Sequence, residues 1–243
     1  MIKKILFKNV VFNNFNEKDF KSIIIKKGVF VFPSAPGVAS ISADKKYSNS
    51  LRHADLVFFD SGLFVLLLSL FKDLKLKRFS GYKFLKFFFE FIKKNNKIKI
   101  LSIDPNKKLS ISNKKYFNSL GVNKIYNYLA PQYNSKNIRD TKLVKYINKI
   151  KPDYILTNIS GGTQEILGVY LKKRLKFKTT IICTGGAISF FTGDQAPIND
   201  FIDKFYLGWF LRLIYNPLMF SKKLLLGLKL IPLVISTNIH IKK

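Results

Sequence analysis

Short runs of β-branched and aromatic residues alternate with longer, helix-like stretches along most of the chain. The strand-like runs cover residues 28–32, 55–59, 97–103, 124–128, 154–159 and 179–183. The segments between them are long enough to cross over a sheet, so successive strands can lie parallel with right-handed connections. The sequence therefore predicts an α/β fold, with a Rossmann-like parallel sheet flanked by helices.

The remaining elements follow from caps and periodicity. Residues 4–12 read as a strand or hairpin arm, and Asn14 with Glu17 resembles a capping box for a short helix reaching about residue 26. Further helices are predicted from the loop 33–37 to residue 51 or 52, and over residues 63–71, 84–92, 107–120, 140–150 and 164–173.

The stretch NISGGTQE, residues 158–165, follows one of these strands and leads into a helix. Gly161 and Gly162 let the backbone turn sharply there, close to the positive end of the helix dipole. Such a turn suits an anionic phosphate. The alternative is an ordinary strand-to-helix turn without a ligand.

Three more loops are expected at the same edge of the sheet, since each follows a predicted strand. They are residues 33–37, 60–62 and 184–186, the last of which contains Gly185 and Gly186. Ligands of open α/β sheets bind outside the carboxyl ends of the strands. The convergence of four loops favours a binding site there.

The chain carries a formal net charge of +29, from 43 basic and 14 acidic residues. This balance favours anionic partners such as phosphorylated metabolites or acidic lipids. The lysines are spread along the chain without a nucleic-acid-reading module, which argues against nucleic acid as the partner.

Cysteine and histidine are scarce. Cys183 is the only cysteine, so neither an intrachain disulfide nor a thiolate-rich zinc site is expected, and His53 and His240 are too few for a histidine metal cluster. No signal peptide and no apolar run of about 18 residues is recognisable, so we expect a cytoplasmic protein.

The C-terminal stretch differs in character, and we expect residues 1–200 to form the α/β domain and residues 201–243 a basic, apolar helical appendage. Its helices are too short to span a bilayer but suited to interfacial docking, with residues 224–235 the better membrane candidate. The alternative is that these helices pack on the sheet.

Five stretches together resemble the WecG/TagA/CpsF family of bacterial glycosyltransferases over roughly residues 28–217. They are LRHADLVFFDSG (51–62), RFSG (78–81), GGTQE (161–165), CTGGAISFFTGDQAP (183–197) and GWFLRLIYNP (208–217). Their order and spacing match those of the family.

The resemblance implies an inverting, metal-independent enzyme without a cofactor. Such an enzyme moves a sugar from a UDP-sugar to a polyprenyl-diphosphate-linked acceptor at the inner membrane face, in the synthesis of surface polysaccharide, teichoic acid or glycolipid. The donor sugar would be an N-acetylhexosamine such as ManNAc, or another hexose. The resemblance leaves homo-oligomer formation open.

The resemblance also assigns roles to residues of this chain. Asp60 corresponds to the catalytic base, and Arg212 to an arginine of the appendage that acts on the diphosphate. The positions implied in substrate binding are Ser34, Gly62, Arg78, Ser80, Gly81, Gly161, Gly162, Gln164, Glu165, Gly185 and Gly186. For Asp60, the residues alone also allow a helix-start aspartate.

Several positions depart from the family pattern. Phe32 and Ser34 stand at its Thr-x-Asn, and Ser34 would supply the hydroxyl near the sugar. Lys83, Ser189 and Gly208 replace two aspartates and a glutamate. These changes indicate a divergent subfamily. A catalytically inactive nucleotide-binding regulator of the same fold, and a basic nucleic-acid-binding protein, are the competing hypotheses.

Overall fold

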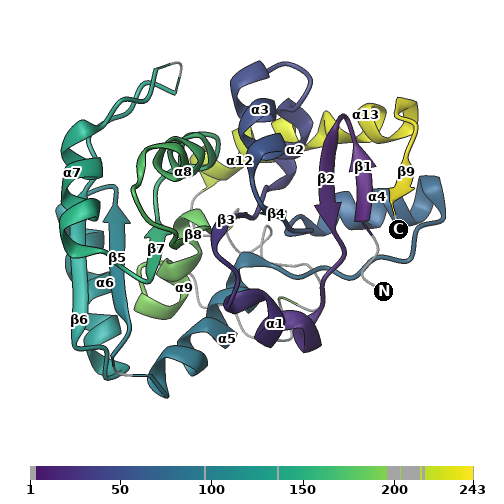
Figure 1. The fold of residues 1–243 in the computed structure, drawn as a ribbon. Coiled ribbons are helices and arrows are strands. Elements are labelled where there is room, and N and C mark those ends of the chain that lie inside the picture. The colour runs from purple at the N-terminus through teal and green to yellow at the C-terminus, as the bar shows by residue number, and fades with distance from the viewer. Residues whose placement is uncertain are drawn as a thin grey trace.

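A computed structural model of the chain describes residues 4–95, 97–135, 137–195, 203, 214 and 217–242. Within this part a six-stranded sheet has the order β4-β3-β8-β7-β5-β6, and every neighbouring pair is parallel (Figure 1). The strands are β3 (Gly28–Val31), β4 (Leu56–Val57), β5 (Lys99–Asp104), β6 (Lys124–Leu129), β7 (Tyr154–Thr157) and β8 (Thr180–Cys183). The predicted α/β fold is confirmed, and each strand lies within one residue of a predicted run or inside it.

The helices alternate with these strands as predicted. They are the short 3-10 helix η1 (Glu17–Asp19), α1 (Phe20–Ile24), α2 (Ala35–Ser40), α3 (Lys45–His53), α4 (Gly62–Lys72), α5 (Gly81–Lys93), α6 (Lys107–Ser119), α7 (Thr141–Ile150), α8 (Thr163–Arg174), η2 (Gly185–Ile188), α9 (Ser189–Thr192), α12 (Pro217–Leu228) and α13 (Leu230–Ser236).

The core lies on both faces of the sheet. Val29 and Val31 of β3 join a buried cluster with side chains of α3, α7 and α8, while Phe30 and Phe32 join a second cluster with α1, α5 and α6. Strand residues alternate between faces, so a strand covered on both sides is apolar throughout. The aromatic helix expected at residues 84–92 is core, since Phe84, Phe88, Phe89 and Ile92 are buried there.

Two local predictions at the N-terminal side were wrong. The capping box is formed by Asn16 and Asp19, two residues beyond the predicted pair, and Asn14 instead accepts a hydrogen bond from the backbone N–H of Lys77. The single helix predicted to reach residue 51 is two helices, α2 and α3. The Asp44 side chain accepts from the N–H of Tyr47 at 2.9 Å and so starts α3 anew.

A second, antiparallel sheet joins the two ends of the described chain. The hairpin of β1 (Lys4–Phe7) and β2 (Val10–Asn13) turns at Lys8 and Asn9, which both have positive φ, as its tight turn requires. Strand β9 (His240–Lys242) pairs with β1 in the order β2-β1-β9 (Figure 1).

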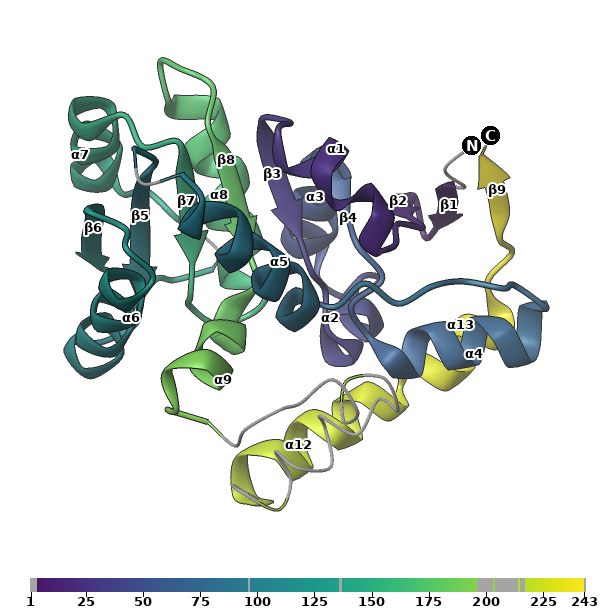
Figure 2. The ribbon, with the colours of Figure 1, turned by 90° about the horizontal axis from the view of Figure 1, so that it is seen from below.

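The C-terminal helices rest on the first part of the chain. Helix α12 packs against α2, and α13 packs against α4 and α2 (Figure 2). The predicted domain boundary between residues 200 and 201 lies outside the described residues and stays a prediction. Among the described helices, none is both long and apolar enough to cross a membrane.

Candidate active site

Four loops lie at the carboxyl edge of four adjacent strands. They follow β4, β3, β8 and β7, which are neighbours in the sheet, and all strands point the same way. The convergence expected from the sequence is therefore real, and it brings Asp60, Ser34, Gly185 and Gly161 to one edge.

The Asp60 loop is held by the start of α5. The half-buried Asp60 accepts a hydrogen bond at Oδ1 from the backbone N–H of Gly81 at 2.8 Å. Its backbone oxygen accepts from Arg78 Nε at 2.6 Å. Helix α4 is capped instead by Ser61, whose Oγ accepts from the N–H of Phe64 at 3.2 Å. Asp60 is thus not the cap of that helix.

Gly81 brings α5 close to the neighbouring loops. A Cβ atom at this position would lie 3.2 Å from Thr184 Cγ2 and 3.6 Å from Phe32 Cβ. The Thr184 hydroxyl beside it is buried without a hydrogen-bond partner in the described part of the chain. Buried hydroxyls normally have partners, so Thr184 is a site candidate that sequence reasoning missed.

Arg78 and Ser80 meet a residue that was not predicted. The carboxylate Oδ1 of Asp203 accepts from Arg78 Nη1 at 2.8 Å and from Ser80 Oγ at 2.9 Å. Asp203 is only 8% exposed. An aspartate inside a basic, apolar stretch was the sequence signal that could have indicated it.

In the NISGGTQE turn, Gly162 forms the N-terminal cap position of α8 with φ 87°, a conformation that favours glycine. Its N–H already donates to Glu165 Oε2 at 2.7 Å. A Cβ atom added at Gly161 or Gly162 would find no other atom within 4 Å, so the turn is open to an approaching ligand. The backbone of this loop is accessible, but its Gly162 N–H is engaged.

Gln164 and Glu165 form a buried pair. Gln164 Nε2 donates to Glu165 Oε1 at 3.1 Å, and Glu165 is 1% exposed. Burial raises the pKa of Glu165 to about 7. Hydrogen bonds from Gln164 and the Gly162 N–H oppose this shift, and the charge of Asp60 adds to it.

The second Gly-Gly turn touches this pair. Gly185 has φ 59°, and a Cβ there would lie 3.4 Å from Gln164 Nε2. At Gly186 a Cβ would lie 3.0 Å from Gln195 Nε2. The two glycine turns are therefore in contact through Gln164, as their adjacent strands require.

Ser34 is exposed at the start of α2 and makes no capping bond. Near it lies the hydroxyl of Tyr47, which would be 2.6 Å from a Cβ on Gly37. Tyr47 is buried. That burial, followed by the charges of Glu165, Asp44 and Asp60, raises its pKa well above the usual value. Sequence reasoning did not single out this tyrosine.

Two of the positions that differ from the family pattern, Phe32 and Lys83, make packing and surface contacts. Phe32 stacks on Phe58 with ring centroids 4.3 Å apart, inside the aromatic cluster. Lys83 pairs with Glu17, so its amine reaches out to η1. Arg212, Gly208 and Pro197 lie outside the described residues.

A buried polar network ties the NISGGTQE turn to β5. The fully buried Asp104 accepts from Ser102 Oγ, Asn113 Nδ2 and Asn158 Nδ2 at 2.7–2.9 Å on one oxygen, and from Asn127 Nδ2 at 2.9 Å on the other. Asn158 is the first residue of the turn, so this network holds its base.

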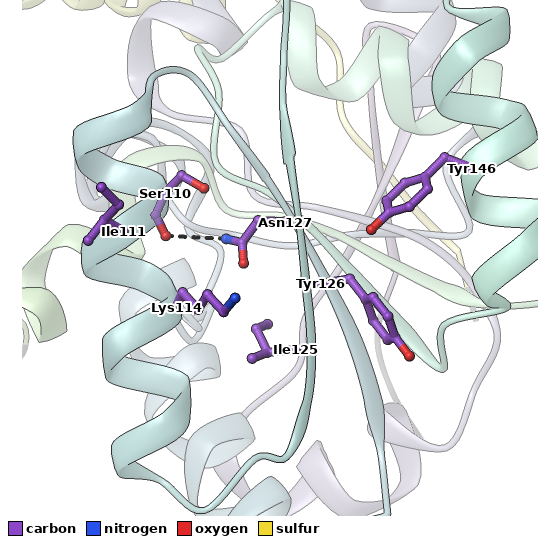
Figure 3. A pocket seen from close by; sticks show the side chains of 7 residues that line it. All are labelled: Ser110, Ile111, Lys114, Ile125, Tyr126, Asn127 and Tyr146. Atoms are coloured by element: carbon purple, nitrogen blue, oxygen red, sulfur yellow. Dashed lines mark hydrogen bonds between the residues drawn. The ribbon is translucent and has the colours of Figure 1, made fainter.

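Beside the network, a hollow of about 330 Å³ opens at the edge strand β6 (Figure 3). Asn127 and Lys114 point into it from one side of the strand, and Tyr126 lies on the other. None of its lining residues was predicted as a site residue. Within the described residues, no cluster of three or more His, Cys, Asp or Glu side chains could hold a metal ion.

An open parallel sheet with glycine turns and a carboxylate at its carboxyl edge defines an α/β protein of the class that binds ligands at that edge. The family model described as "Glycosyl transferase WecG/TagA/CpsF family" matches residues 4–243, whereas no curated protein matches the chain. The chain belongs to the WecG/TagA/CpsF family of glycosyltransferases.

Proposed function

We propose that the protein is an inverting, metal-independent glycosyltransferase that moves a sugar from a UDP-sugar to a polyprenyl-diphosphate-linked acceptor. The sugar would be an N-acetylhexosamine such as ManNAc, or another hexose. The product would enter the synthesis of surface polysaccharide, teichoic acid or glycolipid. The observation that carries the proposal is the place of Asp60, at the edge shared by both glycine turns in a chain of this family.

Asp60 is proposed as the general base. The acceptor hydroxyl attacks the anomeric carbon while its proton passes to the Asp60 carboxylate. The bond from that carbon to the donor's phosphate oxygen breaks, and UDP leaves with the electron pair. The Gly81 N–H bonded to Oδ1 stabilises the carboxylate and fixes its direction.

The leaving diphosphate needs positive charge and N–H donors. Arg78 hydrogen-bonds the backbone of Asp60, and Ser80 lies two residues further along the chain. We propose that both side chains bind the diphosphate, together with the open turn at Gly161 and the glycine turn at Gly185. Arg212, outside the described residues, is proposed in the same role.

Glu165 and Gln164 are proposed to bind the donor sugar or ribose hydroxyls. With a pKa of about 7, Glu165 carries its proton for much of the time near neutral pH. A protonated carboxyl can donate a hydrogen bond as well as accept one. Ser34 and Gly62, on the flanking loops, complete the proposed set.

The acceptor is lipid-linked in this proposal, so the enzyme would work at the cytoplasmic face of the membrane. Helices α4, α12 and α13 lie along one side of the molecule (Figure 2). We propose that their exposed apolar side chains together form a docking surface, which we call the apolar face: Leu66, Leu70, Phe71, Leu218, Leu225, Leu226, Leu228 and Ile235.

Exposed lysines lie on or next to these helices: Lys222 is in α12, Lys229 directly follows it, and Lys75 lies three residues beyond the end of α4. Apolar side chains with lysines around them suit an anionic lipid surface. Because α4 begins directly after Asp60 and Ser61, this face would bring the base close to the membrane.

The test is a panel of nucleotide-sugars followed by a transfer assay. A donor that binds only the folded protein must raise the unfolding temperature, so UDP-sugars should raise it where GDP-mannose does not. The stabilising donor should then glycosylate polyprenyl-diphosphate-linked acceptors, with inversion at the anomeric carbon. Stabilisation without any transfer would favour the inactive regulator instead.

A further inference from the structure

Asp203 is hydrogen-bonded to Arg78 and Ser80, the two side chains that are proposed to bind the donor's diphosphate. Arg78 Nη1 donates to its carboxylate at 2.8 Å and also to its backbone oxygen at 2.8 Å. Ser80 Oγ donates to the same carboxylate oxygen at 2.9 Å. The contact joins residue 203 to a segment 123–125 positions away in the sequence.

The donor set around this carboxylate is one that phosphate oxygens also use. A guanidinium and a hydroxyl that converge on one oxygen bind carboxylate and phosphate by the same charge-assisted hydrogen bonds. The Arg78 guanidinium also donates a hydrogen bond from Nε to the Asp60 backbone oxygen. The anion position therefore lies beside the loop that carries the proposed base.

A diphosphate and the Asp203 carboxylate cannot both use these donors without cost. Both ligands are anions, and like charges at one site repel each other. The ion pair is also well shielded from water, since the side chains of Arg78 and Asp203 are 17% and 9% exposed. Water screens the repulsion little at such a place.

We propose that Asp203 is a built-in competitor for the donor's diphosphate. Its carboxylate holds Arg78 and Ser80 in place while the donor is absent, and the diphosphate takes these donors from it on binding. This inference rests on the proposed function. Asp203 would thereby weaken donor binding. Donor binding would in turn displace the Asp203 carboxylate from Arg78 and Ser80.

The test compares Asp203→Asn with Asp203→Glu. Asparagine keeps the size of the side chain and the backbone contact to Arg78 but removes the charge, so UDP should bind about tenfold more tightly than to the wild type, because the competing state is depopulated. Glutamate keeps the charge and should leave the affinity within about threefold of the wild type. Isothermal titration calorimetry measures both.

A double variant checks that the gain passes through Arg78. In Arg78→Gln, UDP should bind more weakly, and adding Asp203→Asn should then gain less than about twofold, because the competing pair is already broken. A full tenfold gain in that background would contradict competition for Arg78. Equal UDP affinities of wild type and Asp203→Asn would overturn the inference and leave the proposed function standing.

Inorganic pyrophosphate separates the two claims. If pyrophosphate binds Asp203→Asn more tightly than the wild type and UDP binds neither, the anion competition stands and the UDP-sugar proposal fails. If neither probe binds either protein, both claims fail.

Discussion

The N–H of Gly81 donates to Asp60 Oδ1 at 2.8 Å, which ties the loop after β4 to the first turn of α5. The bond needs close approach, and the missing side chain of Gly81 allows it, with Thr184 and Phe32 directly alongside. The start of α5 packs against the loops that follow β3 and β8, and this packing positions the proposed base.

Gly81→Ala should lower turnover several-fold while changing the unfolding temperature little. The new Cβ would meet Thr184 Cγ2 at 3.2 Å and push the start of α5 away from Asp60; a shift of this kind costs roughly 10²-fold per ångström at a reacting centre. Alanine is otherwise the better helix former. Steady-state kinetics and a thermal melt measure the two effects.

The matched control is Gly227→Ala in α12, where the nearest atom would lie at an ordinary 3.5 Å. It should leave turnover with a water-soluble acceptor unchanged. If both alanine variants behave like the wild type, the close approach at Gly81 does not position Asp60.

Glu165 should make stability fall as the pH rises from about 5 to 8. Its folded pKa of about 7 lies above the reference value of 4.5, so the folded state holds a proton that the unfolded chain has released. The stability contribution is complete below the unfolded pKa and is lost as the pH rises through 7. The difference of about 2.5 units amounts to ~3 kcal/mol at most.

Glu165→Gln, which cannot titrate, should flatten this pH dependence of the unfolding free energy. Urea unfolding at a series of pH values measures it for both proteins. The exposed Glu90→Gln serves as the control, and its pH profile should follow the wild type between pH 5 and 8. A Glu165→Gln profile as steep as the wild type's would mean that this carboxyl is not the group responsible.

Leu70→Gln with Leu225→Gln should weaken binding to anionic vesicles at least tenfold. The two side chains are 76% and 65% exposed on α4 and α12, and each buried leucine contributes roughly 1.5–3 kcal/mol on leaving water. Vesicle sedimentation at low and high salt measures the partition, and the lysine contribution should fade with salt.

Ile111→Gln is the control for this face, since Ile111 is 60% exposed on α6. It should bind vesicles like the wild type. If the double leucine variant binds vesicles like the wild type, the apolar face does not dock on membranes. That result would not bear on the proposed transfer chemistry.

Asn158→Ala should destabilise the fold by about 1–3 kcal/mol, because the buried Asp104 then loses a donor. The midpoint of urea unfolding should drop accordingly. Asn95→Ala, which removes an exposed amide bonded to the Phe91 oxygen, is the comparison and should shift the midpoint far less. Equal midpoints for the two variants would contradict a supporting role for the Asp104 network.

Much of the sheet could be predicted because most of its strands are buried on both faces and read as apolar runs. The edge that carries the site followed from this, since parallel strands end together. Helix boundaries were less accessible: the division of α2 from α3 depends on one aspartate cap, Asp44, in a stretch that still reads as helical.

Contacts between distant positions could not be predicted from a single sequence. Strand β9 pairs with β1 across the length of the chain, and local propensity carries no information about such pairing. The Asp203 contact to Arg78 and the three asparagine donors around Asp104 likewise join separate elements. These contacts are the part of the candidate site that the structure adds.

The role of Asp60 as general base is tested by measuring the turnover of Asp60→Asn together with its UDP affinity, with Asp73→Asn as the control. Asp73 is an exposed aspartate in a left-handed conformation, which asparagine also tolerates. We predict that Asp60→Asn loses at least 10²-fold in sugar transfer while its UDP affinity stays within about threefold of the wild type. Undiminished transfer by Asp60→Asn would contradict the role of Asp60 as general base.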